Sequence, residues 1–269
     1  MFDTLHSDQY DKDVVHLSEQ IGSASRIVKH DGPLDLIETP TGAWWVSRND
    51  HILPFLLSEQ RHNIYGTGID GVNRGDVVLD CGANVGTFTK TALNRGARLV
   101  VAIEISPSAI ECLRRNFAAE VSQGRVIIYP KGVWNEPTYL EMAMVQDWNP
   151  AANSVVFSRA SAGKIRVPVS TVDLIVEELH LDRVDFVKMD IEGAEKQALL
   201  GATATIRHFR PRMAISSEHF QDDYARLPGI INSIEPEYRI KASDCYADVF
   251  SVRPSVLLCR FPPASQSTQ

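Results

Sequence analysis

The stretch Val77–Lys90, VVLDCGANVGTFTK, constrains the fold of this chain more than any other segment. A run of apolar residues ends in Asp80, glycines follow at once, and a helix-like pattern begins after them. A strand, a glycine turn and a helix in this order are typical of the first unit of an open parallel sheet. Such sheets bind ligands beyond the carboxyl ends of their strands. We therefore expect an α/β fold with a binding site at this turn.

The segments that follow alternate between strand-like and helix-like patterns. We expect strands at residues 76–82, 98–106, 125–134, 183–193 and 212–219, and helices at 86–96, 107–122, 170–181 and 194–209. Residues 238–261 instead hold strand signals separated only by a turn-rich loop, which indicates an antiparallel pair. The pattern predicts a Rossmann-like, mostly parallel seven-stranded sheet with an antiparallel C-terminal strand and helices on both faces.

Residues 1–74 are expected to form a helical and hairpin extension in front of a main domain at 75–262, with a flexible tail at 263–269. Helix-like spacing covers 13–28, and two strand-like runs flank a turn at 39–42. A further helix is expected over 51–66, with Asn49 or Asp50 as its cap. The extension is a candidate cap over the substrate, or an interface in a homo-oligomer.

Composition excludes several classes of protein. Hydrophobic residues make up 44 % of the 269 residues, which favours a well-filled core. The net charge of -7 gives no basic footprint for nucleic acid. Four widely spaced cysteines indicate reduced thiols. The polar N-terminus does not resemble a signal peptide, and no apolar run approaches the ~18 residues that span a bilayer. We expect a cytoplasmic protein without a membrane partner.

The spacing of the glycines distinguishes between classes of cofactor. Three residues, with Asn84 in the middle, separate Gly82 from Gly86, so the close glycine pair of the G-x-G-x-x-G fingerprint is absent, and no GK[ST] follows. Asp80 suits a cationic ligand better than a pyrophosphate. Glu104 ends the next strand, about 20 residues further on, where a carboxylate accepts the hydroxyls of a ribose. A ligand with a ribose, an ammonium group and no phosphate is S-adenosylmethionine.

Several segments resemble known methyltransferases. VVLDCGANVGTFTK and VVAIEISPSA are similar to motif I and the following acidic motif of class I S-adenosylmethionine-dependent methyltransferases. VPVSTVDLIVEE followed by VDFVKMDIEGAEKQALLGA resembles the signature of the FkbM family, as do the hairpin IETPTGAWWV and the later ISSEH. The resemblance covers about residues 35 to 260, and Cys81 stands where the family usually has valine. It implies a class I methyltransferase fold and S-adenosylmethionine as cofactor.

The resemblance also assigns residues to the cofactor. Asp80 and Gly82 would line its methionine end, Glu104 would hold the ribose, and the segment 131–133 would lie along the adenine. Glu59, for which a solvated helix face is the alternative, and Tyr65 would close over the methionine. Val133 has ordinary core packing as its alternative. The predicted cofactor-binding residues are Glu59, Tyr65, Asp80, Gly82, Asn84, Gly86, Glu104, Ile105, Gly132, Val133 and Asp190.

The predicted catalytic residues are Asp190, Glu218 and His219, at the ends of the fourth and fifth strands of the domain. Asp190 is a candidate base or orienting group for the acceptor. The same three side chains are candidate ligands for a divalent cation. Without a metal, His219 would be the general base, oriented by Glu218 or Asp190. In the alternative without a catalytic role, Glu218 caps a loop and His219 is a surface histidine. Glu192 and Glu195 open the next helix, where acids complement the helix dipole, and for Glu192 a place in the site is the alternative.

The leading function is O-methylation of a hydroxyl on a small-molecule or sugar-like acceptor, since FkbM-type enzymes suggest oxygen as the acceptor atom. Transfer to a carboxylate or a nitrogen remains open. A nicotinamide-dependent oxidoreductase and a nonenzymatic nucleoside-binding module are the alternatives from other classes. Aromatic side chains are candidate walls of the acceptor pocket, with the insertion around Trp148 as a candidate lid. They are Trp44, Trp45, Trp134 and Trp148.

Overall fold

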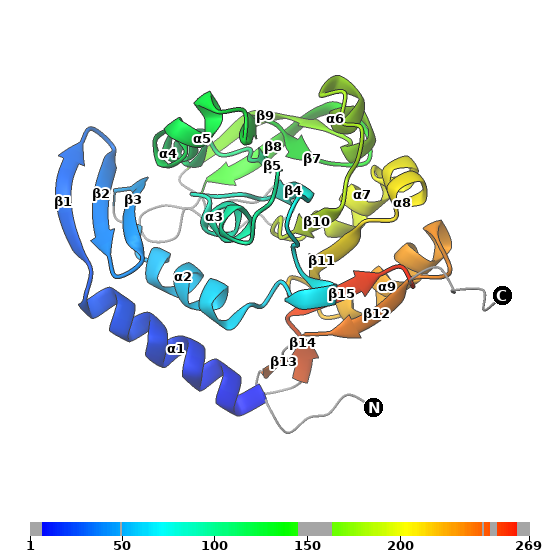
Figure 1. Cartoon of the computed structure of the whole chain (residues 1–269), viewed down its shortest axis with the longest axis horizontal. Helices are drawn as coiled ribbons and strands as arrows, with labels where there is room; N and C mark the ends of the chain where they lie inside the picture. Colours follow the sequence, from blue (N-terminus) through cyan, green and yellow to red (C-terminus); the bar gives the residue numbers. More distant parts are fainter. Residues whose placement is uncertain (1–6, 49, 145–162, 244, 248–251, 263–269) are drawn as a thin grey trace.

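A seven-stranded sheet forms the centre of the computed structural model, which describes residues 7–48, 50–144, 163–243, 245–247 and 252–262 (Figure 1). The strand order is β12-β15-β11-β10-β4-β5-β6. The strands are β4 (Val77–Cys81), β5 (Leu99–Ile103), β6 (Val126–Tyr129), β10 (Phe186–Met189), β11 (Arg212–Ser216), β12 (Arg239–Ala242) and β15 (Val256–Arg260). Neighbours are parallel except around β15, which is antiparallel to β11 and β12. The predicted sheet is thereby confirmed.

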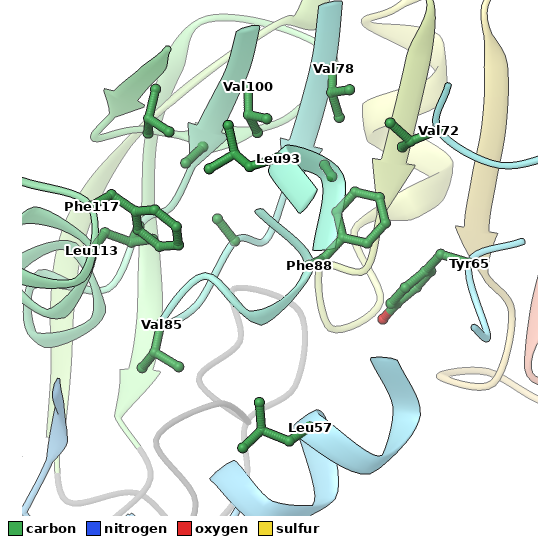
Figure 2. Close-up of a cluster of buried hydrophobic side chains, with 14 of the residues drawn as sticks. Leu57, Tyr65, Val72, Val78, Val85, Phe88, Leu93, Val100, Leu113 and Phe117 are labelled. Atoms are coloured by element: carbon green, nitrogen blue, oxygen red, sulfur yellow. The ribbon is translucent and has the colours of Figure 1, made fainter. Parts of the chain in front are cut away.

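Helices cover both faces of this sheet. They are α3 (Thr87–Asn94), α4 (Pro107–Asn116), α5 (Ala118–Ser122), α6 (Val172–Glu178), α7 (Glu195–Leu200), α8 (Thr203–Phe209) and α9 (Asp223–Ile234). Because side chains alternate along a strand, neighbouring residues enter different cores. Val78 and Phe186 belong to a cluster with Phe88 of α3, part of which Figure 2 shows. Leu79 and Val187 belong to the cluster on the other face.

The N-terminal segment packs against one face of the domain rather than standing apart from it (Figure 1). It contains α1 (Ser7–Ser23), β1 (Arg26–Asp31), β2 (Leu34–Thr39), β3 (Gly42–Ser47), α2 (Leu53–His62) and the 3-10 turn η1 (Gly68–Asp70). The hairpin predicted around 39–42 is confirmed as β2 and β3. Leu57 of α2 and Tyr65 are buried in the cluster that contains Val78 and Phe88 (Figure 2). The segment therefore completes the core on this face.

Two details of this segment differ from the prediction. The helix expected over 13–28 ends at Ser23, because the chain turns there and enters β1, which pairs with β2. The helix expected from residue 51 begins at Leu53, after Ile52 as its N-cap. The Asp50 carboxylate accepts a hydrogen bond from the Ile52 amide at 2.8 Å, so it supports the turn before the helix. Asn49 lies outside the described residues.

The connection between β6 and α6 also differs. The single strand expected over 125–134 is wrong, because Pro130 interrupts it and cannot donate to a sheet. The chain leaves the main sheet there. A separate sheet follows, with β7 (Gly132–Val133) beside β9 (Gly163–Ser170), and β9 beside β8 (Thr138–Met144). The insertion with Trp148 and the tail at 263–269 lie outside the described residues.

The helix predicted over 194–209 is also divided in the structure. It breaks at Gly201, where an added Cβ would lie 2.1 Å from the Trp134 carbonyl oxygen, so the chain passes too close for a side chain. The helix α9 had no sequence prediction, and it carries Pro228 in its interior. A small pair, β13 (Cys245–Ala247) and β14 (Val252–Pro254), precedes β15. Within the described ranges, no helix is both long and apolar enough to cross a membrane.

Candidate active site

A cavity opens at the carboxyl ends of β4, β5 and β10, beside the point where the sheet order reverses between β4 and β10. It holds about 1030 Å³ of space when its open mouth is counted. Its walls come from α2 and Tyr65 beyond it, the ends of β5 and β10, the turns that follow the three strands, the first turns of α3 and α4, β7, and one residue of β9. This is where ligands bind in open α/β sheets, and the volume suits a nucleoside cofactor together with a small acceptor.

The turn after β4 is held in a conformation that requires glycine. Gly82 has a φ of +80°, and a Cβ there would lie 2.0 Å from the Asp190 carbonyl oxygen. Gly86 has a φ of +97°, and its Cβ would meet the Phe117 ring at 2.1 Å. Gly82 and Asn84 line the cavity, whereas Gly86 lies behind the wall as the N-cap of α3. The two glycines thus bring the turn close to both β10 and α4.

Asp80 lies beneath the cavity and is not part of its wall. Its carboxylate is fully buried, accepts a hydrogen bond from the Thr89 hydroxyl at 2.7 Å, and lies 3.4 Å from Lys188 Nζ. Lys188 also donates to the Gly82 carbonyl at 2.7 Å and reaches the cavity wall. The Asp80 carboxylate is therefore the counter-charge of a buried lysine that holds the glycine turn. The contact predicted between Asp80 and the cofactor remains a prediction.

Lys188 is a site residue that the sequence interpretation missed. Its signal was available, because a lysine inside the apolar run FVKMD must be buried on the sheet. A buried ammonium group requires a charged partner. The parallel register of β4 and β10 sets Lys188 directly opposite Asp80.

Glu104 presents a fixed carboxylate at the centre of the cavity wall. One oxygen accepts hydrogen bonds from the amides of Ile105 and Ser106, both at 2.8 Å, and the other accepts one from the Asn84 amide at 2.7 Å. Burial raises the pKa of Glu104, and these three amides oppose that rise. The amides fix the direction of the carboxylate, which is the arrangement that a pair of ribose hydroxyls requires.

The wall beside Glu104 is apolar. Ile105 lies against Gly132, where an added Cβ would come within 2.5 Å of the Ile105 side chain. Val133 and Val169 continue this surface. Val133 is both a cavity residue and part of the buried cluster, so it does have the ordinary core packing, and its contact with adenine remains a prediction. Such a surface suits the face of an adenine ring.

Asp190 stands on the opposite side of the cavity, directly after β10. Its Oδ2 accepts a hydrogen bond from the Tyr65 hydroxyl at 2.6 Å, and its Oδ1 lies 3.7 Å from His219 Nε2. Burial alone would raise the pKa of Asp190, but the charges of Lys188 and His219 and the bond from Tyr65 outweigh it, so the pKa is lowered. Asp190 is therefore ionised at neutral pH.

His219 is surrounded by three carboxylates. Its Nδ1 lies 3.2 Å from Glu195, and its Nε2 lies 3.7 Å from Asp190 and 3.9 Å from Glu192. Burial lowers the pKa of His219, yet Glu195, followed by the other two acids, raises it to about 10. The imidazole therefore carries a proton at neutral pH. The raised pKa argues against the general-base role considered for His219, because an imidazole must be neutral to accept a proton.

One of the two acidic residues grouped with His219 differs from the prediction. Asp190, Glu195 and His219 each offer one ligand atom within 4.8 Å of the others, so Glu195 takes the place predicted for Glu218. Glu195 is 1 % exposed and accepts a hydrogen bond from the Ile191 amide at 2.8 Å. Its carboxylate therefore fixes the turn after β10 and faces His219, beyond any effect on the helix dipole. Glu218 is exposed.

The N-terminal segment supplies Glu59 and Tyr65 to the cavity wall, as the prediction of a closing element requires. The pKa of Glu59 is raised well above its ordinary value, first by burial and then by the charges of Asp190 and Glu218. Glu192 lines the cavity from the turn after β10, in a left-handed conformation with φ of 55°. Such a conformation is unfavourable for glutamate, and strained backbone of this kind is a feature of many functional sites.

The predicted aromatic wall is absent from the part of the cavity that the structure describes. Trp44 is buried in the core, and Trp45 lies under the Arg115 guanidinium at 4.6 Å while Asn116 binds its backbone. Trp134 is half-buried outside the wall. The hairpin thus packs on α4 rather than on the cavity. Trp148 lies outside the described residues.

Solved structures with similar folds include several methyltransferases. Methyltransferase FkbM from Methylobacillus flagellatus KT aligns with a TM-score of 0.54 at 18 % identity, over 93 % of this chain and 59 % of that chain. Fibrillarin from Aeropyrum pernix, solved with natively bound S-adenosyl-L-methionine, gives 0.41 at 14 % identity, over 87 % of this chain and 97 % of that one. TYW2 from M. jannaschii, in complex with AdoMet, gives 0.40 at 15 % identity, over 87 % and 86 %.

The similarity to the M. flagellatus protein shows that the two proteins share a fold. This chain spans 59 % of the length of that protein. No curated protein matches the chain. The profile of the Methyltransferase FkbM domain, however, matches residues 80–238, which is more than half of the sequence and includes the turn after β4, Glu104, Asp190 and His219. The chain therefore belongs to the FkbM methyltransferase family.

Proposed function

We propose that this protein transfers the methyl group of S-adenosylmethionine to a hydroxyl of a small-molecule or sugar-like acceptor. The observation that carries the proposal is the placement of two carboxylates with different surroundings in one cavity. Glu104 is fixed by backbone amides beside an apolar wall, and Asp190 is held ionised on the opposite side. The Glu104 carboxylate suits the binding of a nucleoside, and the Asp190 carboxylate suits the acceptance of a proton from the acceptor.

The residues of the cavity fit the cofactor. Glu104 would accept the ribose hydroxyls, and Ile105, Gly132 and Val133 would flank the adenine. Gly132 has no side chain to fill the space beside Ile105, which keeps this wall flat. The methionine end would face Gly82 and Glu59. S-adenosylmethionine supplies an activated methyl group on a positively charged sulfur, which leaves as a neutral thioether.

The protein would act on the acceptor through Asp190. An ionised carboxylate accepts a hydrogen bond from the acceptor hydroxyl, orients its oxygen and takes its proton as the new bond forms. His219, as an imidazolium, keeps Asp190 ionised and compensates the nearby acids. A carboxylate acceptor is disfavoured because the ionised Asp190 and the Glu192 side chain line the same cavity. An amine acceptor suits these acids as well and is the second candidate.

The proposal is tested by a transfer assay with methyl-labelled S-adenosylmethionine over matched panels of hydroxyl, amine and carboxyl compounds. We expect label in hydroxyl compounds, with one S-adenosylhomocysteine formed for each methyl group transferred. Label confined to amines would move the proposal to N-methylation. The absence of transfer together with oxidation or reduction of a nicotinamide would refute it.

Chelation of divalent cations should leave the activity within about twofold of the untreated enzyme. The physical reason is that a protonated His219 has no free nitrogen lone pair with which to bind a metal, and its positive charge already offsets part of the negative charge of Asp190 and Glu195. Turnover after EDTA treatment, with and without added Mg²⁺, is the measurement, and metal analysis of the purified protein is the control. Loss of activity that Mg²⁺ restores would show that a cation occupies this group.

A further inference from the structure

The Tyr65 side chain connects the N-terminal segment to Asp190. Tyr65 follows α2, is 5 % exposed, and donates a hydrogen bond from its hydroxyl to Asp190 Oδ2 at 2.6 Å. The two residues are 125 positions apart in the sequence. Burial, and then the charge of Asp190, raises the pKa of Tyr65 well above its ordinary value, so the hydroxyl remains a proton donor.

The ring of Tyr65 is fixed on several sides. Phe88 of α3 lies beside it (Figure 2) and meets it edge to face, with the ring centroids 5.2 Å apart. Phe88 stacks in turn on Phe186 of β10, at a centroid distance of 5.9 Å. Lys188 Nζ lies 5.4 Å from the centre of the Tyr65 ring. Because these neighbours belong to the sheet and to α3, the hydroxyl has a set position relative to the end of β10.

This hydrogen bond makes the two oxygens of Asp190 different. Oδ2 accepts the hydrogen bond of the Tyr65 hydroxyl, whereas Oδ1 lies 3.7 Å from His219, beyond hydrogen-bonding distance, and the Ser216 side chain adds a further favourable interaction with the carboxylate. A charge-assisted bond of this length fixes the rotation of the carboxylate about its side chain. Oδ1 is thereby the oxygen that is presented to an acceptor.

We propose that Tyr65 is a positioning residue for methyl transfer, which holds Asp190 by Oδ2 so that Oδ1 meets the acceptor hydroxyl. This role differs from the contact with the cofactor that the sequence suggested for Tyr65. The inference rests on the proposed function, because it assigns Tyr65 to the residue that handles the acceptor. Its consequence is that the N-terminal segment contributes to turnover as well as to the shape of the cavity.

Tyr65→Phe is the direct test, since it removes the hydroxyl and keeps the ring that packs on Phe88. We expect kcat to fall about 10- to 100-fold, as for a lost hydrogen bond to a charged group, while the Kd for S-adenosylmethionine stays within about threefold. The acceptor is the hydroxyl compound with the highest turnover in the labelled-methyl screen. Tyr129→Phe is the matched control, because the buried Tyr129 also donates to a carboxylate, Glu178, at 2.5 Å. Its kcat should stay within about threefold.

A double-mutant cycle separates positioning from other roles. If Tyr65 acts through Asp190, Tyr65→Phe causes no further loss of kcat in the Asp190→Asn background. A loss that adds fully to that of Asp190→Asn overturns the inference, as does a weakening of S-adenosylmethionine binding by more than about tenfold with unchanged kcat. Circular dichroism and melting temperature verify that each variant is folded. If the wild-type protein neither binds S-adenosylmethionine nor transfers its methyl group, the proposed function fails first, which is a separate outcome.

Discussion

Asp190→Asn should reduce kcat by about two to four orders of magnitude, the range that a positioned proton acceptor contributes. Asparagine keeps the shape of the side chain and still accepts a hydrogen bond from Tyr65, but it has no negative charge with which to take a proton. Because the ribose and adenine would be held by other residues, the Kd for S-adenosylmethionine should change by less than about threefold. Single-turnover transfer of a labelled methyl group measures the loss of rate, and calorimetry measures the Kd for S-adenosylmethionine.

Asp182→Asn is a suitable control for the loss of one acid near this part of the chain. Its side chain is 75 % exposed and pairs with Arg98 on the surface, so turnover should be unaffected. One outcome for Asp190→Asn would contradict the assignment of Asp190 as the proton acceptor. Normal turnover at saturating cofactor, with a large loss of affinity, would place Asp190 in cofactor binding.

Glu104→Gln should weaken binding of S-adenosylmethionine by about 10- to 100-fold. The replacement keeps the volume but removes the charge. Its amide group would also face backbone amides of Asn84, Ile105 and Ser106, which are donors themselves. Calorimetric titration with S-adenosylhomocysteine and with its 2′-deoxy analogue shows whether the loss comes from the ribose. The wild type should prefer the ribose form, and the variant should lose most of that preference.

The control for Glu104→Gln is Glu111→Gln on α4, which removes an exposed acid that pairs with Arg115. It should leave both affinities unchanged. If Glu104→Gln retains the wild-type preference for the ribose form, the carboxylate does not bind the ribose, whatever the total loss of affinity.

The parts of the site that the sequence predicted depend on short-range patterns. The positive φ of the turn favours glycine at position 82, whatever surrounds it. The place of Glu104 at the end of a strand follows from the repeat of strand, helix and strand. The alternation of apolar segments was also sufficient to predict a mostly parallel sheet with an antiparallel end, although it gave no strand order. Such features are visible in one sequence because each is set by neighbouring residues.

The remaining features depend on contacts between distant residues. No local pattern indicates that Tyr65 donates to Asp190 or that Glu195 faces His219, and the run FVKMD indicates a buried Lys188 without naming Asp80 as its partner. The ionisation of His219 follows from three acids that only the fold assembles. Glu195, rather than the predicted Glu218, lies close to both His219 and Asp190 only in the folded chain. These contacts determine which group can accept a proton.

Titration of the wild-type protein with S-adenosylmethionine and, separately, with NADH tests the identity of the cavity most directly. We predict saturable binding of S-adenosylmethionine at one site per chain, competition by S-adenosylhomocysteine, and no measurable heat with NADH. Saturable binding of NADH without binding of S-adenosylmethionine would contradict both the cofactor assignment and the methyl-transfer mechanism built on it.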